Sequence, residues 1–347
     1  MNKSEKIKLG ISIGDFNGIG IEIILKTFLD KRMLDFCTPI IFGSTKLITS
    51  YKKNLNLNIP YNGIKNIDKA IHGKINILNL WKEDINVEIG KPTEISGKYA
   101  FKSLEAATNS LVKKEIDVLV TAPINKDNIQ SEEFKFPGHT EYLESKVKGE
   151  SLMILMTDSL RVGLITGHIP VSKVPKAITP NLIKKKVRIL HKTLVQDFAI
   201  PKPKIAILGL NPHCGDNGVI GKEDDEIIRP TIAEIQDTGK LVYGPYAADS
   251  FFGSENYKNF DAILAMYHDQ GLAPFKTLSF GEGVNYTAGL DEVRTSPDHG
   301  TAYDLAGKDK ANINSFKEAV FTGIQIFKTR TEYKSLTENT LKITHQK

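Results

Sequence analysis

The sequence predicts an α/β protein with mixed sheets and two subdomains, and three observations support that class. Eight short runs rich in Ile, Leu and Val alternate with stretches of helical length, and such apolar strands belong to sheets covered on both faces. Two neighbouring runs, SLMILMT and RVGLITG, lie too close together for a crossover helix, so they predict an antiparallel hairpin. The 347 residues are long for a single core.

Individual elements follow from the local pattern. A helix should begin at Ser96, because Ala100, Leu104, Ala107 and Leu111 form one apolar stripe. The last helix, SFKEAVFTGIQIFKTR, should pack back onto the first subdomain. The hairpin should turn at Asp158 and Ser159. The eight expected strands are, in order, KLGISIG (8–14), TPIIFG (38–43), KINILNL (74–80), DVLVTAP (117–123), SLMILMT (151–157), RVGLITG (161–167), KIAILGL (204–210) and DAILAMY (261–267).

No internal repeat and no low-complexity linker separates these elements. Two subdomains joined by crossing segments are therefore expected, rather than independent units in series. We place the first subdomain at residues 1–127 together with 306–347, and the second at residues 128–305.

The composition excludes several classes of protein. The net charge of +5 is small, and the lysines are scattered apart from Lys184–Lys186, so no nucleic-acid-binding surface is expected. The two cysteines, Cys37 and Cys214, lie far apart, which excludes a disulfide scaffold and fits a reducing cytoplasm. No apolar run of 18 residues and no signal-peptide pattern is present. We therefore expect a cytoplasmic protein without membrane association.

Three histidines stand just beyond the ends of apolar runs. His168 follows RVGLITG, His213 follows KIAILGLNP and His268 follows DAILAMY, and each lies beside a Gly or Pro turn. Any one alone would be an ordinary core or capping histidine. In α/β sheets, however, ligands bind outside the carboxyl ends of strands. Three imidazoles placed alike, in the second subdomain, therefore favour a divalent metal site that leaves a position open for substrate.

The other polar clusters are typical of anion binding. His139 and Thr140 stand at an expected helix start, where free backbone N–H groups favour a phosphate or carboxylate. Lys276, Asn285 and Arg294 follow the His268 strand, and Arg can grip such anions with two N–H groups. Singly, each would be an ordinary surface residue.

The N-terminal GISIGDFNGIGIEIILK resembles a dinucleotide-binding turn, but its spacing does not match. Ile23 stands where the third glycine of G-x-G-x-x-G should be, so no Rossmann fingerprint is expected. The glycines should instead let the strand enter the helix closely, with Asp15 as the helix cap.

Motifs along most of the chain resemble the 4-hydroxythreonine-4-phosphate dehydrogenase family of vitamin B6 biosynthesis. They occur in the family's order over about residues 8–320: GDFNGIGIE, TAPINK, GHTEYL, ITGHIPVSKVP, LNPHCGDNGVIGKED, GPYAADSFF, YHDQGLAPFK and RTSPDHGTAYDLAG. The resemblance implies a homodimer with an isocitrate/isopropylmalate dehydrogenase-like fold and an active site in the inter-domain cleft. Phe16 and Ile21 replace two prolines of the family's usual GDPxGIGPE.

The resemblance also implies roles for individual residues. Metal ligands would be His168, His213 and His268, one of them supplied by the partner subunit. Substrate would contact His139, Thr140, Lys276, Asn285 and Arg294. The loop SPDHGTAYDLAG would hold the adenosine part of NAD through His299, Gly300 and Asp304. Asp249 and Asp269 are candidates for proton transfer or for support of the metal ligands.

The implied reaction is oxidation of 4-phosphooxy-L-threonine at C3 by NAD, followed by decarboxylation to 3-amino-2-oxopropyl phosphate. The ion is left open between Zn²⁺, Mg²⁺, Mn²⁺ and Co²⁺, and NADP is a second candidate for the cofactor. One alternative is a related dehydrogenase of another phosphorylated 3-hydroxy acid, such as a four-carbon sugar-acid phosphate. Others are a metal-dependent hydrolase or isomerase without a nicotinamide, and a non-enzymatic binding protein.

Overall fold

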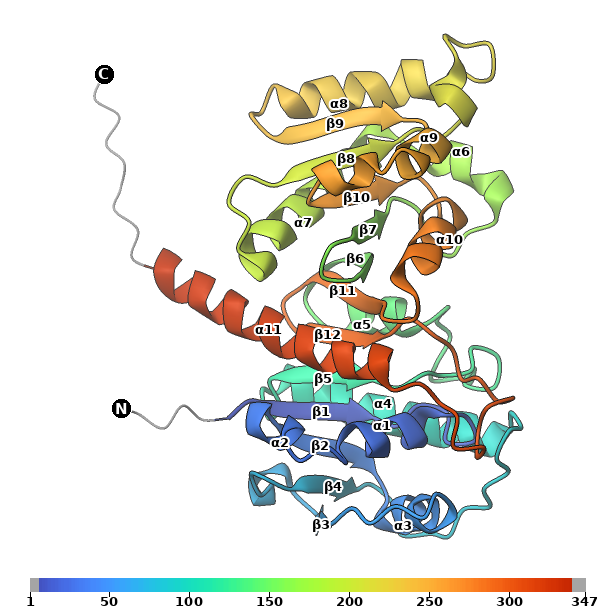
Figure 1. Cartoon of the computed structure of the whole chain (residues 1–347), viewed down its shortest axis with the longest axis vertical. Coiled ribbons are helices and arrows are strands. Elements are labelled where there is room, and N and C mark those ends of the chain that lie inside the picture. The colour runs from blue at the N-terminus through green and yellow to red at the C-terminus, as the bar shows by residue number, and fades with distance from the viewer. Residues whose placement is uncertain (1–5, 339–347) are drawn as a thin grey trace.

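The computed structural model describes residues 6–338, and these are built around one continuous sheet of twelve strands (Figure 1). From one edge to the other the strands are β3 (Tyr61–Ile64), β4 (Ile75–Asn79), β2 (Thr38–Gly43), β1 (Lys8–Ser12), β5 (Val118–Thr121), β12 (Val293–Pro297), β11 (Val284–Leu290), β6 (Gly149–Met156), β7 (Arg161–Leu164), β10 (Ala262–Ala265), β8 (Lys204–Leu208) and β9 (Leu241–Tyr246).

The sheet is mixed, as predicted. Neighbours from β3 to β12 run parallel, β11 and β6 are antiparallel to their neighbours, and β7, β10, β8 and β9 are again parallel. All eight predicted strands are present. The hairpin of β6 and β7 closes where the Thr157 N–H donates to the Leu160 carbonyl at 2.9 Å, with Asp158 and Ser159 between them.

The strands β12 and β11 join the two halves of the molecule into one continuous sheet. Arg294 of β12 pairs with Leu119 of β5, and Asn285 of β11 pairs with Ser296 of β12. The two joining strands have the sequences VNYTAGL and VRTSP. They contain too many polar residues to stand out as apolar runs, although most of their residues are buried.

Helices cover both faces of the sheet (Figure 1). The helix predicted to begin at Ser96 begins two residues earlier, at Glu94, because Thr93 and Ser96 form a reciprocal capping box. Its Ala100–Leu104–Ala107–Leu111 stripe is buried, as predicted. The helices are α1 (Gly20–Thr27), α2 (Met33–Phe36), α3 (Thr45–Asn54), α4 (Glu94–Val112), α5 (His139–Lys146), α6 (Val174–Ala177), α7 (Pro180–Phe198), α8 (Arg229–Gln236), α9 (Ala248–Gly253), α10 (His268–Ser279) and α11 (Asn314–Thr337).

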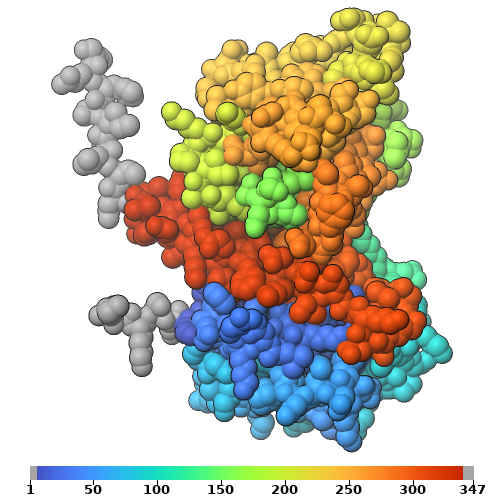
Figure 2. All heavy atoms as spheres, viewed as in Figure 1, coloured from blue at the N-terminus to red at the C-terminus, as the bar shows by residue number. Residues whose placement is uncertain are grey.

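The C-terminal helix α11 contacts both halves of the sheet. It packs on β5 and α1 of the predicted first subdomain, as expected, and also on β12, β11 and α7 of the predicted second subdomain. At its far end Arg330 forms two hydrogen bonds with Asp197 of α7, at 2.8 and 2.9 Å, and one with the Tyr286 hydroxyl of β11 at 2.8 Å. The space-filling view shows an upper and a lower lobe on either side of this helix (Figure 2). The exact division into subdomains stays a prediction.

Asp15 does not cap α1, contrary to expectation. The cap position is Ile19, and the fully buried Asp15 carboxylate instead accepts hydrogen bonds from neutral donors in four segments. These are the Asn17 N–H at 2.9 Å, the Ser96 hydroxyl at 2.8 Å, the Asn128 amide at 2.7 Å and the Tyr303 hydroxyl at 2.8 Å. Asp15 therefore ties together the loops that border the central strands.

Within residues 6–338, no helix has both the length and the apolar character needed to span a bilayer.

Candidate active site

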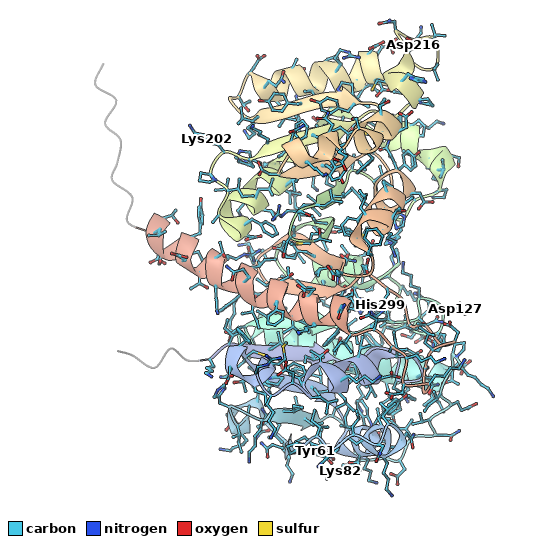
Figure 3. All side chains as sticks on the ribbon, viewed as in Figure 1. Tyr61, Lys82, Asp127, Lys202, Asp216 and His299 are labelled. Atoms are coloured by element: carbon cyan, nitrogen blue, oxygen red, sulfur yellow. The ribbon has the colours of Figure 1, made fainter. Side chains whose placement is uncertain are left out.

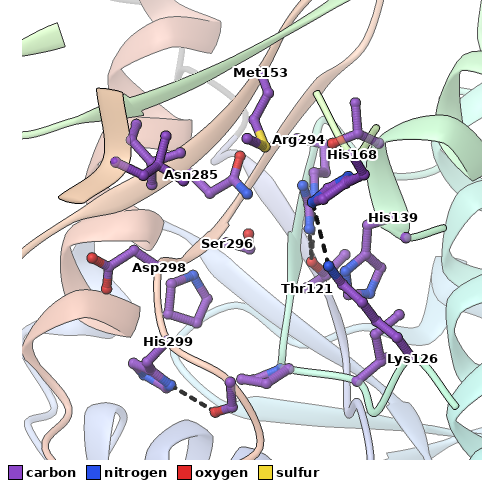
Figure 4. Close-up of a pocket in the computed structure, with 18 of the residues that line it drawn as sticks. Thr121, Lys126, His139, Met153, His168, Asn285, Arg294, Ser296, Asp298 and His299 are labelled. Atoms are coloured by element: carbon purple, nitrogen blue, oxygen red, sulfur yellow. Dashed lines mark hydrogen bonds between the residues drawn. The ribbon is translucent and has the colours of Figure 1, made fainter. Parts of the chain in front are cut away.

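A cleft of about 270 Å³ lies over the middle of the sheet. It is lined by residues of β5, β12, β11 and β6, by the first turn of α5, by His168 and by one side of α10. In Figure 4, Lys126, His139, His168 and Arg294 lie on one side, and Asn285, Asp298 and His299 lie on the other. Small-molecule sites usually have volumes of about 300–1,000 Å³, so this cleft suits a small metabolite.

Arg294 supplies a buried positive charge at the floor of the cleft. Only 2% of its surface is exposed. Its Nε and Nη2 groups donate to the Thr121 hydroxyl at 3.1 and 2.5 Å, and Nη1 donates to the Thr287 hydroxyl at 3.0 Å. Burial lowers the pKa of the guanidinium, which nevertheless stays charged at neutral pH. No carboxylate of the described chain hydrogen-bonds it, so the charge is available to a ligand.

The first turn of α5 faces Arg294. His139 begins this helix and Thr140 follows, and both line the cleft. Burial and the positive charges of Arg294 and Lys126 lower the pKa of His139 well below its usual value, so the ring is neutral. Because the first N–H groups of a helix lack intrahelical acceptors, this turn adds donors for an anion.

Several buried polar atoms around the cleft have no hydrogen-bond partner within residues 6–338. They are His139 Nε2, Glu141 Oε2, Asn285 Oδ1 and His299 Nε2, and all four residues line the cleft. Buried polar groups in folded proteins are nearly always paired. A ligand with both donors and acceptors would satisfy these atoms.

His168 and His268 converge at one side of the cleft. They follow β7 and β10, which are neighbouring parallel strands, and their ring centroids are 5.5 Å apart. His168 Nδ1 lies 3.2 Å from Glu141 Oε1, and His268 Nδ1 lies 2.7 Å from Asp269 Oδ1. A carboxylate on one ring nitrogen leaves the other free for a metal ion, so these two side chains fit a divalent cation.

The third predicted ligand, His213, does not line this cleft. It lies in the 3₁₀ turn Pro212–Gly215 after β8, with φ of 53° and an exposed side chain. Figure 3 shows nearby Asp216 at the far end of the molecule from His299. Across the described residues, no three His, Cys, Asp or Glu side chains gather as metal ligands. One copy of the chain therefore contributes two of the three predicted ligands.

The remaining predicted site residues divide between the cleft and its surroundings. Lys276 and Asn285 line it, as do His299 and Gly300. The exposed Asp269 reaches it only through His268. Asp249 and Asp304 are exposed and do not line it.

Three charged residues of the cleft were not predicted from the sequence: Lys126, Glu141 and Asp298. Lys126 Nζ lies 3.3 Å from His168 Nε2, and the Asp298 carbonyl accepts from Lys276 Nζ at 3.0 Å. The signal was available, because all three belong to motifs quoted above: TAPINK, GHTEYL and RTSPDHGTAYDLAG.

The loop that carries His299 and Gly300 is fixed to the N-terminal turn. The Thr301 carbonyl accepts from the Ile19 N–H at 3.0 Å, and the Tyr303 hydroxyl donates to Asp15. A side chain at Gly18 would meet the Thr301 carbonyl at 2.6 Å. The turn glycine therefore permits a close approach of two backbones at the edge of the cleft.

The depressed pKa of His139 leads to a pH-dependent stability. An unfolded histidine titrates near pH ~6.5, so the unfolded chain takes up this proton before the folded protein does, and acidification destabilises the fold. Between about pH 6.5 and 5.5, ligand-free wild type should lose more unfolding free energy in urea than His139→Gln. The difference should be at most about 1 kcal/mol, because a single proton is taken up over one pH unit below the unfolded pKa. Equal losses in both proteins would contradict a neutral His139.

A family model and individual relatives of known name both match this chain over most of its length. The family model described as pyridoxal phosphate biosynthetic protein PdxA matches residues 35–322. A 4-hydroxythreonine-4-phosphate dehydrogenase from Bacteroides thetaiotaomicron is 50% identical over 342 residues, which cover 98% of this chain and 94% of that protein. A relative from Oceanobacillus iheyensis, provisionally named D-threonate 4-phosphate dehydrogenase, is 35% identical over 94% of this chain and 100% of its own.

A solved structure of 4-hydroxythreonine-4-phosphate dehydrogenase from Klebsiella pneumoniae superposes with a TM-score of 0.78. It is 29% identical, and the match covers 94% of this chain and 99% of that one. This confirms the fold class predicted from the sequence. The extent of the family match and the 50% identity over nearly the whole length show that this chain belongs to the pyridoxal phosphate biosynthetic protein PdxA family.

Proposed function

We propose that this chain is an NAD- and divalent-metal-dependent dehydrogenase that oxidises 4-phosphooxy-L-threonine at C3 and releases CO₂ to form 3-amino-2-oxopropyl phosphate. One observation carries the proposal: a buried guanidinium to which no carboxylate of residues 6–338 is hydrogen-bonded shares a small cleft with a pair of carboxylate-held imidazoles. The first feature suits a phosphate or carboxylate, and the second suits a metal ion beside a hydroxyl group. The relatives named 4-hydroxythreonine-4-phosphate dehydrogenase supply the substrate.

The substrate's two anionic groups would be held at opposite sides of its C3 atom. Arg294, His139 and Thr140 would bind one, and Lys276 would bind the other from α10. Asn285, with its unpartnered oxygen, would accept a hydrogen bond from the substrate's amino or hydroxyl group. Fixing the substrate at several points directs C3 toward the nicotinamide and removes the entropic cost of alignment from the chemical step.

The metal ion would be held through Nε2 of His168 and of His268, and when bound it would act as a Lewis acid on the C3 hydroxyl and on the keto oxygen. Asp269 would keep Nδ1 of His268 protonated and Nε2 free. His299 and Gly300 would border the nicotinamide dinucleotide, with their loop fixed by the Tyr303–Asp15 hydrogen bond. Asp304 is exposed on the same loop and would face the adenosine part.

The proposal includes a homodimer whose copies complete each other's sites. His213 and Asp249 both lie outside the cleft of their own chain. The charge of Asp249 contributes to raising the pKa of Cys214, the neighbour of His213, so Asp249 lies within electrostatic reach of that turn. The partner's copies of these two side chains would then supply the third ligand and a further carboxylate. The two free cysteines fit the reducing cytoplasm that the proposal assumes.

The test follows NAD reduction at 340 nm with 4-phosphooxy-L-threonine and metal-stripped protein. Reduction should be absent without metal, and it should return when Zn²⁺, Mg²⁺, Mn²⁺ or Co²⁺ is added back. Formation of CO₂ in equal amount to NADH would establish decarboxylation. If no ion restores reduction of NAD or of NADP, the proposed reaction is excluded.

A second candidate is oxidation of a related phosphorylated 3-hydroxy acid. The 35% identical relative provisionally named for D-threonate 4-phosphate favours including it. The same assay, run with D-threonate 4-phosphate, decides between them by the ratio of kcat/KM values. A higher kcat/KM for the threonate ester would replace the substrate and keep the site.

A further inference from the structure

Glu141 connects the substrate-binding turn to one of the two histidines. It lies in the first turn of α5, directly after His139 and Thr140. Its Oε1 atom is 3.2 Å from His168 Nδ1, and its Oε2 atom is buried without a partner in the described part of the chain. Across the ring, His168 Nε2 is 3.3 Å from Lys126 Nζ. Glu141, His168 and Lys126 therefore form a short chain of polar contacts along one wall of the cleft.

The chemistry of these three groups determines which ring nitrogen carries the proton. A carboxylate accepts hydrogen bonds and an ammonium group donates them. A neutral His168 between them must therefore donate from Nδ1 to Glu141 and accept at Nε2 from Lys126.

We propose that Glu141 is a positioning residue that holds His168 in the Nδ1–H tautomer and aims Nε2 into the cleft. This inference rests on the proposed function for the purpose of that Nε2 atom, which would bind the metal ion. Because His139 and Thr140 share the same helical turn, Glu141 also links the placement of the substrate's anionic group to the placement of a metal ligand.

Another glutamate on the same helix, Glu144, shows what a purely structural role would look like. One turn later, Glu144 anchors α5 to β6, accepting from the Ser151 N–H at 3.0 Å and from the Ser151 hydroxyl at 2.9 Å. Glu144 does not line the cleft. Glu144→Gln therefore loosens the attachment of α5 without touching His168, which makes it the matched control.

The first experiment reads the tautomer directly. Protein labelled with ¹⁵N-histidine is examined by NMR at pH 8, without metal or substrate, and the His168 signals are assigned by their loss in His168→Asn. Wild type and Glu144→Gln should show the Nδ1–H form. In Glu141→Leu, which removes the acceptor at Nδ1, the share of the Nε2–H form should rise above that of wild type, because only the Lys126 ammonium then still favours Nδ1–H. Glu141→Gln keeps an acceptor oxygen and should retain much of the Nδ1–H form.

The second experiment measures Zn²⁺ or Co²⁺ affinity by competition with a chromogenic chelator. Loss of a carboxylate that supports a metal-bound histidine typically weakens binding about 10- to 100-fold. Glu141→Leu should fall in that range, Glu141→Gln should lose less, and Glu144→Gln should match wild type.

Three results would overturn the inference: an unchanged tautomer in Glu141→Leu, unchanged metal affinity in that variant, or an equal loss in Glu144→Gln. A different set of results would exclude the proposed function while leaving this inference intact. If wild type binds no metal and yet Glu141→Leu changes the tautomer, the positioning of His168 stands and the metal-dependent reaction falls.

Discussion

Replacing His268 with alanine is expected to lower kcat/KM for metal-dependent NAD reduction by a factor of about 10³ or more. His268 is one of two imidazoles that a single copy of the chain brings to the cleft, and its Nδ1 atom is held by Asp269. Polarisation of an oxygen by a bound cation provides several kcal/mol of transition-state stabilisation, and each ~1.36 kcal/mol corresponds to a tenfold change in rate. Steady-state rates at a metal concentration that just saturates wild type would measure the effect.

The control for this variant is His191→Ala on α7. His191 is also partly buried, and burial lowers its pKa, but it does not line the cleft. Its kcat/KM should stay within about twofold of wild type. Part of the activity of His268→Ala should return at high metal concentration, because the lost ligand weakens binding first. If His268→Ala reduced NAD at the wild-type rate even when a chelator keeps the free metal concentration low, His268 would be excluded from the site.

The sequence predicted the parallel parts of the sheet better than its centre. Strands such as β1, β5, β8 and β10 are buried on both faces and consist almost wholly of apolar residues, so pattern alone identified them. The joining strands β11 and β12 are buried too. There Arg294, Thr287 and Thr295 satisfy one another or the backbone, and that pairing is a tertiary contact invisible in a local pattern.

For the site, too, contacts between distant parts of the chain limited what could be predicted from the sequence. His168 and His268, each beyond the end of its strand, lie together at the cleft, as the rule for strand ends leads one to expect. The turn after β8 carries the His213 side chain to the outside of the same chain, so its role as a ligand stays a prediction. Glu141 was overlooked, since a carboxylate at a helix start is an ordinary feature of the macrodipole. Its contact with His168 depends on how α5 packs near β7, which the sequence does not reveal.

Replacing Arg294 with methionine should have opposite effects on activity and stability. The guanidinium is buried among the Thr121 and Thr287 hydroxyls without a carboxylate hydrogen-bonded to it. A buried charge without a charged partner is costly to the fold, and apolar replacements at such positions are often neutral or stabilising. The substrate's anion, by contrast, would lose its charged partner, which typically costs about 2–5 kcal/mol. We therefore expect kcat/KM to fall about 10²- to 10⁴-fold, while Tm stays equal or rises.

Two further variants separate charge from shape in this prediction. Arg294→Lys keeps the charge but loses the planar fork that spans Thr121 and Thr287, so it should recover only part of kcat/KM. Arg161→Met removes another partly buried arginine, which stacks 4.7 Å from the Phe198 ring outside the cleft. That change should lower Tm and leave kcat/KM nearly unaltered. If Arg294→Met instead lost both Tm and activity, Arg294 would be a structural residue, and the anion would have to bind through Lys126, Lys276 and the first turn of α5.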